Sequence, residues 1–299
     1  MGRLTVDAHA KVNLDLRILA VRDDGYHELE TVFQTLALHD TLAVVERPGP
    51  FSLTCDAPGV PIDASNLVWR AARAIWQAAG RPGEPTGVGV ELTKHIPAEA
   101  GLGGGSADGA AALISLDRMW GTALGVPRLT DLAASLGADV PFFLMGGTAL
   151  GRGRGDRLQP LPAFPSCHVV IVRPQFGVST AAAYGWYDES EARPSASGTW
   201  PDRPAGWPAA LATCRNDLEA AVARRHPEIG ELRQALERGG SRLALMSGSG
   251  STVFGLFDRA DLAQRAAAAL GAAGRTVMVT ETRDGPACHV RLPPGPGLV

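Results

Sequence analysis

The sequence predicts a two-domain α+β protein, and three observations lead to this fold class. The chain has 299 residues, which is enough for two domains of ordinary size, each with its own core. Segments typical of strands and segments with helical spacing of apolar residues are mixed along both halves. A proline-rich stretch at 160–165 separates the halves. We therefore predict an N-terminal domain over 1–162 and a C-terminal domain over 163–299.

The first half predicts a meander of strands followed by helices. Residues 11–18 alternate between apolar and polar side chains, as a half-buried strand does. Extended runs at 29–38 and 41–46 follow a turn signal at 23–25. A helix is expected over 66–79 with Ser65 as its N-cap, then a strand at 88–92, a helix that begins near Ser106, and a helix at 129–136.

The second half predicts a smaller set of strands and helices. The apolar run 167–172 indicates a buried strand, and further strands are expected at 243–246, 252–257 and 276–280. Helices are expected at 218–225, 227–238 and 261–273. Residues 191–208, rich in Pro, Ser, Gly and Trp, predict a long surface loop, and the tail after 293 is predicted to be disordered.

Composition and charge argue against several classes of partner. The formal net charge of −3 provides no general attraction to nucleic acid or to an anionic membrane. No segment has the length and apolar character of a signal core or a membrane span. The four cysteines lie far apart without a C-x-x-C pair, which fits reduced thiols. We expect a soluble cytoplasmic protein, a monomer or weak homodimer, with no nucleic acid and no membrane as partner.

The most informative segment is rich in glycine and precedes a predicted helix. We call it the glycine segment, and it consists of Pro97, Ala98, Glu99, Ala100, Gly101, Leu102, Gly103, Gly104, Gly105, Ser106 and Ala107. A glycine loop at a helix N-terminus offers unpaired N–H donors and the positive end of the helix dipole to an anion, usually a phosphate. No Lys follows the glycines as in a Walker A loop, and Ser106 stands where a dinucleotide fingerprint has its third Gly. From these residues alone, an ordinary glycine-rich turn stays an alternative.

Three motifs together resemble the GHMP kinase superfamily, which includes galactokinase, homoserine kinase, mevalonate kinase and phosphomevalonate kinase. They are AKVNL at 10–14, the glycine segment, and MSGSGS at 246–251, in matching order across nearly the whole chain. The resemblance implies an ATP-dependent kinase of a small molecule. It also implies an N-terminal domain like the second domain of ribosomal protein S5, a ferredoxin-like C-terminal domain, and a site in the cleft between them.

Two further motifs narrow the resemblance within the superfamily. DGYHEL at 24–29, with the following TVFQ at 31–34, and GADVPFF at 137–143 resemble kinases of the non-mevalonate isoprenoid pathway. Those kinases phosphorylate the 2-hydroxyl of a cytidine diphosphate-linked methylerythritol. The chain departs from their pattern at Glu99-Ala100 and at Ala107. The alternatives are another small-molecule kinase, of homoserine or mevalonate type, and a GHMP-fold protein that senses a ligand without catalysis.

The resemblance implies two catalytic residues, Lys11 and Asp139. By themselves, Lys11 would be interpreted as an exposed strand lysine and Asp139 as a turn or capping residue. In the resemblance, the lysine lies beside the reacting hydroxyl and the γ-phosphate, where its charge stabilises the transition state. The aspartate takes the hydroxyl proton as general base. A pure sensor would need no such base.

The resemblance also implies how the ligands bind. Backbone N–H groups of the glycine segment bind the ATP phosphates, so that a Cβ at Gly103 or Gly104 would intrude on them. Ser106 is the expected ligand of phosphate or of Mg²⁺. The residues expected to bind the substrate, and above all its cytosine, are Asn13, Tyr26, His27, Thr180 and Tyr184.

Overall fold

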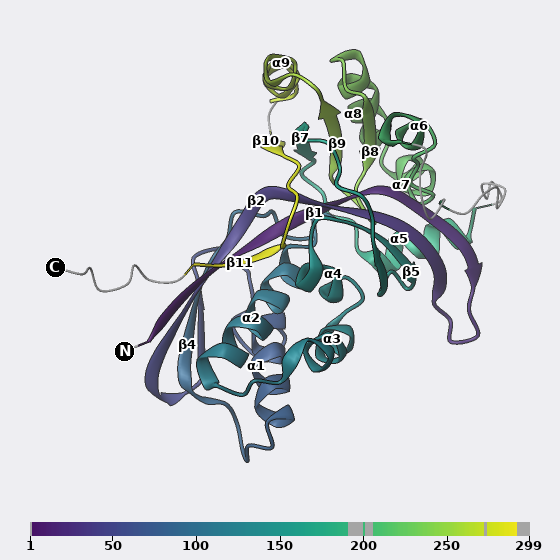
Figure 1. Ribbon diagram of the computed structural model, residues 1–299. Helices are drawn as coiled ribbons and strands as arrows, with labels where there is room; N and C mark the ends of the chain where they lie inside the picture. The colour runs from purple at the N-terminus through teal and green to yellow at the C-terminus, as the bar shows by residue number, and fades with distance from the viewer. Residues whose placement is uncertain (1, 191–199, 201–205, 272–273, 292–299) are drawn as a thin grey trace.

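The computed structural model describes residues 2–190, 200, 206–271 and 274–291, and it contains two sheets, one in each half of the chain (Figure 1). The strands and helices of the first half are β1 (Arg3–Val21), β2 (His27–Pro50), β3 (Ser52–Cys55), α1 (Leu67–Ala78), β4 (Thr86–Thr93), α2 (Gly104–Trp120), α3 (Gly125–Leu136), α4 (Val140–Met145), β5 (Thr148–Gly153) and β6 (Arg157–Pro160). Those of the second half are β7 (His168–Arg173), α5 (Thr180–Asp188), α6 (Trp207–Leu211), α7 (Glu219–Arg225), α8 (Glu228–Arg238), β8 (Leu243–Met246), β9 (Val253–Phe257), α9 (Ala260–Leu270), β10 (Thr276–Glu281) and β11 (Cys288–Arg291).

The N-terminal sheet is built on two very long strands, β1 and β2, which pair antiparallel along their lengths. Its strand order is β11-β1-β2-β4-β3, and β5 and β6 extend it beside β2. Helices α1 to α4 gather on one side of this sheet, below the long strands in Figure 1. The alanine-rich middle of α2 is buried in the core, because only small side chains allow a helix to pack so closely on strands.

The C-terminal sheet has the strand order β10-β7-β9-β8, all antiparallel. In chain order this is 4-1-3-2, with helices α5 to α8 between the first and second strands and α9 between the third and fourth. That is the βαββαβ arrangement of ferredoxin-like domains. The predicted two-domain α+β fold is confirmed.

Several local predictions need correction. The runs 29–38 and 41–46 are parts of one strand, β2, since no Gly or Pro stands between them and pairing with β1 continues through His39 and Asp40. The N-cap of α1 is Asn66, whose side chain accepts a hydrogen bond from the Val68 N–H at 2.8 Å. Ser65 instead donates to Asp63.

The end of the described chain returns to the first sheet. Strand β11 pairs antiparallel with β1, with Ala8 opposite Cys288. The division at 162/163 stays a prediction, but residues 288–291 lie in the sheet of the other half. Most of the predicted loop at 191–208 and all of the predicted tail after 293 fall outside the described residues. Within the described part, no helix is both long and apolar enough to cross a membrane.

Candidate active site

Lys11 lies on the face of β1 that meets the glycine segment, and its side chain is 4% exposed. Its Nζ donates to Asn13 Oδ1 at 2.6 Å and to the carbonyl oxygen of Gly101 at 3.0 Å. The same Nζ is 3.4 Å from Asp139 Oδ2. The interpretation of Lys11 as an exposed strand lysine is therefore wrong, and the two predicted catalytic residues are neighbours.

Asp139 occupies the N-cap position of α4, but its side chain makes no capping hydrogen bond. Its carboxylate instead faces Lys11 and is 35% exposed. Burial raises the pKa of the Tyr184 hydroxyl, and the nearby charge of Asp139 raises it further. Asp139 thus lies between a buried ammonium from the N-terminal domain and an aromatic residue of the C-terminal domain.

The glycine segment leads into α2 with its first backbone donors left unpaired. Gly103, in the left-handed region at φ 72°, is the N-cap, and no side chain caps the helix. The N–H groups of Gly104, Gly105 and Ser106 precede the first i→i−4 bond, which runs from Ala107 to Gly103. N–H groups at a helix start favour an anion, and binding of the ATP phosphates at this place stays a prediction. Ser106 is half-buried, and its hydroxyl makes no hydrogen bond to another described residue.

A second glycine-rich loop, Ser247–Ser251, supports the first one. Ser247 Oγ donates to the Gly101 carbonyl at 2.9 Å, beside the bond that Lys11 makes to the same oxygen. A Cβ at Gly101 would be 2.1 Å from the Ser247 carbonyl oxygen, so only glycine fits there. On the other side of the loop, Ser249 and Thr180 hydroxyls lie 3.2 Å apart. The 247–251 loop therefore joins the glycine segment to α5.

A side chain at Gly103 or Gly104 was expected to meet the bound phosphates, but the space around these glycines shows that it would first meet the protein itself. A Cβ at Gly103 would lie 2.6 Å from the ring of Phe143, and one at Gly104 would lie 3.0 Å from Ile96. Side chains at these positions would disturb the protein before any phosphate arrives. At Gly105 the nearest atom to a Cβ is at 4.0 Å, in the side chain of Leu67. An added Cβ at Gly105 would therefore leave the surrounding protein undisturbed.

Four of the predicted substrate residues, Asn13, His27, Tyr184 and Tyr26, lie in three different surroundings. Asn13 donates to Thr31 Oγ1 at 2.7 Å and so lies beside Lys11. His27 and Tyr184 stack with ring centroids 4.8 Å apart. Tyr26 is 57% exposed and packs under the guanidinium of Arg154, 5.4 Å from the ring centroid. No ring contact joins Tyr26 to Tyr184 among the described residues, and their expected binding of one base stays a prediction.

Sequence reasoning missed a buried charge cluster behind the glycine segment. Lys94 Nζ binds Asp40 and lies 2.7 Å from Asp108 Oδ2. Asp40 Oδ1 also accepts the N–H groups of His95 at 2.6 Å and of Ile96 at 2.8 Å. Asp108 Oδ1 is buried without a hydrogen bond, and this burial raises the pKa of Asp108. The cluster fixes the strand end that leads into the glycine segment.

Two further residues that hold the site were also missed. Thr31 Oγ1 accepts from Asn13 and donates to the Asp15 carbonyl at 2.7 Å. The side chain of Asn216 donates to the carbonyls of Met246 and Gly248 at 2.7 and 2.8 Å and so fixes the 247–251 loop. The pairing of β1 with β2 could have indicated Thr31, but no local pattern distinguishes Asn216.

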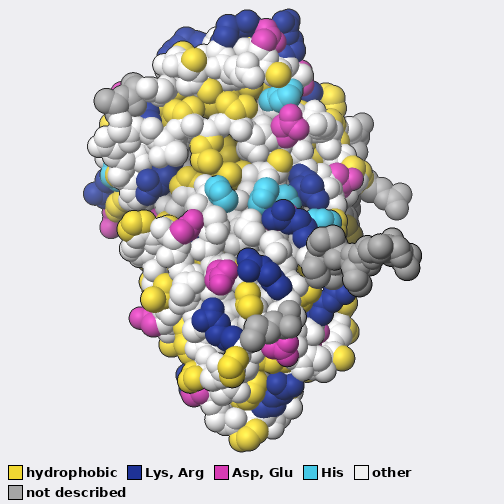
Figure 2. Space-filling view, turned by 90° about the vertical axis from the view of Figure 1, so that its left-hand side faces the viewer, with side chains coloured by type: hydrophobic (Ala, Val, Ile, Leu, Met, Phe, Trp, Pro, Cys, Tyr) yellow, Lys and Arg dark blue, Asp and Glu magenta, His cyan; other side chains and the backbone are white. Residues whose placement is uncertain are grey.

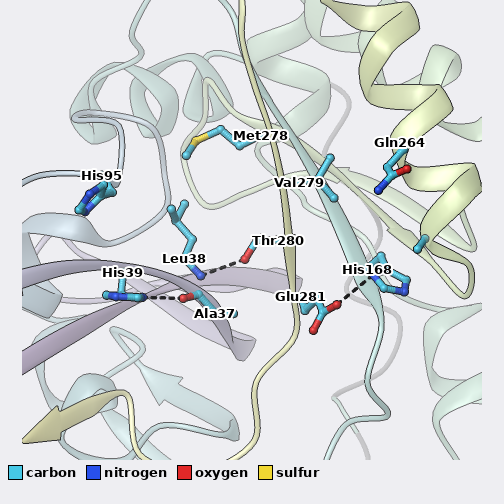
Figure 3. A pocket seen from close by; sticks show the side chains of 11 residues that line it. Ala37, Leu38, His39, His95, His168, Gln264, Met278, Val279, Thr280 and Glu281 are labelled. Atoms are coloured by element: carbon cyan, nitrogen blue, oxygen red, sulfur yellow. Dashed lines mark hydrogen bonds and ion pairs between the residues drawn. The ribbon is translucent and has the colours of Figure 1, made fainter. Parts of the chain in front are cut away.

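A separate cavity of about 620 Å³ lies between β2, β10 and α9, and it contains none of the predicted site residues (Figure 3). Its lining combines His39, His95 and His168 with apolar side chains such as Met278. The face in Figure 2 likewise shows histidines beside a group of apolar side chains. Among the described residues, no three His, Cys, Asp or Glu side chains come together as a metal site.

Comparisons with known proteins agree with this geometry. Residues 66–147 match the GHMP kinases N terminal domain, and 205–276 match the GHMP kinases C terminal domain. A solved structure of homoserine kinase from Cytophaga hutchinsonii shares the fold at 19% identity, with a TM-score of 0.72 over 97% of this chain and 98% of that one. The fold and the site define a GHMP kinase, an ATP-dependent kinase of small molecules.

Relatives of higher sequence identity indicate which family of GHMP kinases the chain belongs to. The chain is 43% identical to the 4-diphosphocytidyl-2-C-methyl-D-erythritol kinase of Pelotomaculum thermopropionicum, over 93% of this chain and 98% of that protein. It is 41% identical to the kinase of the same name from Moorella thermoacetica, over 94% and 100%. A crystal structure of 4-(cytidine 5'-diphospho)-2C-methyl-D-erythritol kinase matches with a TM-score of 0.75 at 40% identity, over 93% and 99%. The chain belongs to this kinase family.

Proposed function

We propose that this chain transfers the γ-phosphate of ATP to the 2-hydroxyl of 4-diphosphocytidyl-2-C-methyl-D-erythritol. The observation that carries the proposal is the meeting of Lys11, Asp139 and the unpaired N–H groups of α2 at one place. A kinase of this family needs all three: a cation, a base and a phosphate site. The proposed substrate is inferred from the names of the relatives.

In the reaction, Asp139 accepts the proton of the 2-hydroxyl as the oxygen attacks the γ-phosphorus. The bond to the oxygen between the β- and γ-phosphates breaks, and ADP leaves. An aspartate is a weak base toward an alcohol, so placement and the charge of Lys11 supply most of the acceleration. Lys11 stabilises the negative charge on the reacting oxygens, and Asn13 with the Gly101 carbonyl fixes where its Nζ lies.

Magnesium is part of this proposal. When bound, Mg²⁺ neutralises charge on the triphosphate, and phosphate oxygens and water supply most of its ligands. The Ser106 hydroxyl fits as a protein ligand, since it lies at the start of α2 and has no partner among the residues described. A cytoplasmic location, a monomer or weak homodimer, and the lack of a nucleic acid partner stay predictions.

Recognition of cytosine completes the proposal. Aromatic stacking on Tyr26 or Tyr184 contributes about 1–3 kcal/mol per base but does not distinguish cytosine from uracil. A polar group matched to the edge of the base must do so, because an unpaired buried donor or acceptor is costly. His27 is the proposed reader, since its ring lies against Tyr184.

A coupled assay of ADP release with a panel of alcohols tests the function. We expect rapid phosphorylation of the cytidine diphosphate conjugate and very poor activity with methylerythritol phosphate, homoserine or mevalonate. Equal activity on the nucleotide-free alcohol would contradict the substrate assignment and leave the wider kinase class. Binding of ATP and substrate without ADP release would support a ligand sensor instead.

A further inference from the structure

His27 is fixed in place by residues of the C-terminal domain. It is the first residue of β2, and its side chain is 8% exposed. Its ring stacks on Tyr184 and meets Tyr187 edge-on, with ring centroids 6.2 Å apart. Its Nε2 lies 2.9 Å from Oδ1 of Asp188, the last residue of α5. Packing fixes the ring plane, and the carboxylate contacts one of its two nitrogens.

The chemistry of this contact determines where the protons of His27 lie. A carboxylate can only accept a hydrogen bond, so Nε2 must carry a hydrogen. In the neutral imidazole the other nitrogen, Nδ1, is then a bare acceptor. Nδ1 makes no hydrogen bond to any residue that the structure describes, so it is the nitrogen left for a ligand.

The position of Asp188 is poor for the helix that carries it. A carboxylate in the last turn of a helix faces the negative end of the helix dipole, which is unfavourable. The side chain of Asp188 is 44% exposed, so it contributes little to packing. Its carboxylate nevertheless contacts the ring of His27 across the two halves of the chain.

We propose that Asp188 is a specificity-determining positioning residue, which holds His27 as the tautomer whose Nδ1 accepts a hydrogen bond from the amino group of cytosine. This inference rests on the proposed function. Cytosine presents a donor, N4–H₂, where uracil presents the O4 acceptor. Opposite Nδ1, cytosine makes a hydrogen bond, whereas uracil places two acceptors against each other. Asp188 thereby selects the base without touching it.

The test compares kcat/KM for the cytidine and uridine diphosphate conjugates in Asp188→Ala, Asp188→Asn and the wild type. We expect Asp188→Ala to reduce the preference for cytidine roughly tenfold, the size of one hydrogen bond. Asp188→Asn keeps an acceptor oxygen and should retain most of the preference. An unchanged cytidine-to-uridine ratio in Asp188→Ala would overturn the inference.

Glu189→Ala is the matched control. It removes the next carboxylate along the chain, which pairs with Arg225 at 2.8 Å rather than with His27, and it should leave the ratio unchanged. A second readout needs no activity: ¹⁵N chemical shifts of His27 should show the hydrogen on Nε2 in the wild type. A hydrogen on Nδ1 would overturn the inference. If the wild type did not phosphorylate the cytidine conjugate, the proposed function itself would fail, and the ¹⁵N result would still report on Asp188.

Discussion

Lys11 and Lys94 lie on either side of the glycine segment, both are nearly buried, and both face aspartate. Lys94 lies between Asp40 and Asp108, whose side chains are 0% and 5% exposed. The aspartate partner of Lys11, Asp139, is 35% exposed. The charge of Lys94 is thus neutralised by buried carboxylates, whereas the aspartate that faces Lys11 is open to solvent. In the proposed function, exposure of the aspartate partner, rather than of the lysine itself, distinguishes the proposed catalytic lysine, Lys11, from the structural one, Lys94.

The largest expected effect is a loss of stability in Lys94→Met. Removal of the ammonium leaves two buried carboxylates without a cation, and breaking a buried pair in this way costs about 3–5 kcal/mol. Urea unfolding of Lys94→Met and of Lys11→Met measures how much free energy of unfolding each variant loses. Lys11→Met should lose much less, because its aspartate partner reaches water. Equal losses in the two variants would contradict the distinction between the lysines.

For kcat we expect the opposite order of the two lysines, with the larger loss on replacement of Lys11. Lys11→Met and Asp139→Asn should retain ATP and substrate binding but lose on the order of 10²–10³ in kcat, as when a positioned electrostatic or acid–base group is removed. Steady-state assays at saturating substrate, with calorimetric affinities, measure both quantities. Near-normal turnover of Asp139→Asn would mean that the transfer needs no base.

Asp108→Asn tests the charge balance around Lys94 through pH. Burial raises the pKa of Asp108, so the folded state holds a proton that the unfolded chain releases near its ordinary value of about 4. Below the ordinary pKa of about 4, the proton contributes its whole stabilisation to the folded state. This stabilisation decreases as the pH rises toward the raised pKa, by at most about 1.4 kcal/mol per pH unit. Relative to Asp108→Asn, the wild type should therefore lose stability between pH 4.5 and 8. A constant difference would show that another group carries the proton.

The smallest expected effect lies between the two lysines, at Gly105. Because its Cβ would meet only Leu67 at 4.0 Å, Gly105→Ala should change the free energy of unfolding by no more than about 1 kcal/mol. Calorimetry should nevertheless show weaker ATP binding, since a methyl group enters the phosphate site. Gly103→Ala, with Phe143 in the way, should lose stability as well. Unchanged ATP affinity in Gly105→Ala would contradict the binding of the ATP phosphates at this loop.

The sequence by itself determined the fold class, the positions of most helices and the likeness of its motifs to a kinase superfamily. These depend on local features: apolar spacing that reports which face is buried, and short motifs whose residues are adjacent in the chain. The alternation of 11–18 placed Lys11 and Asn13 on one face of a strand, and the structure has them bonded. The helix start predicted near Ser106 lies two residues away from the observed one at Gly104, and the left-handed N-cap Gly103 is known only from the structure.

Only the tertiary structure decided which distant residues meet. Asp188 reaches His27 because α5 packs against the start of β2. Lys94 meets Asp40 because β2 runs unbroken through residue 40, and it meets Asp108 because α2 packs on the same sheet. In each case the partners are far apart in the chain, so no local pattern of polarity relates them. Their pairing depends on strand register and on how the domains pack, which are properties of the whole fold. The motifs thus indicate the kind of chemistry, and long-range packing determines which nitrogen and which carboxylate come together.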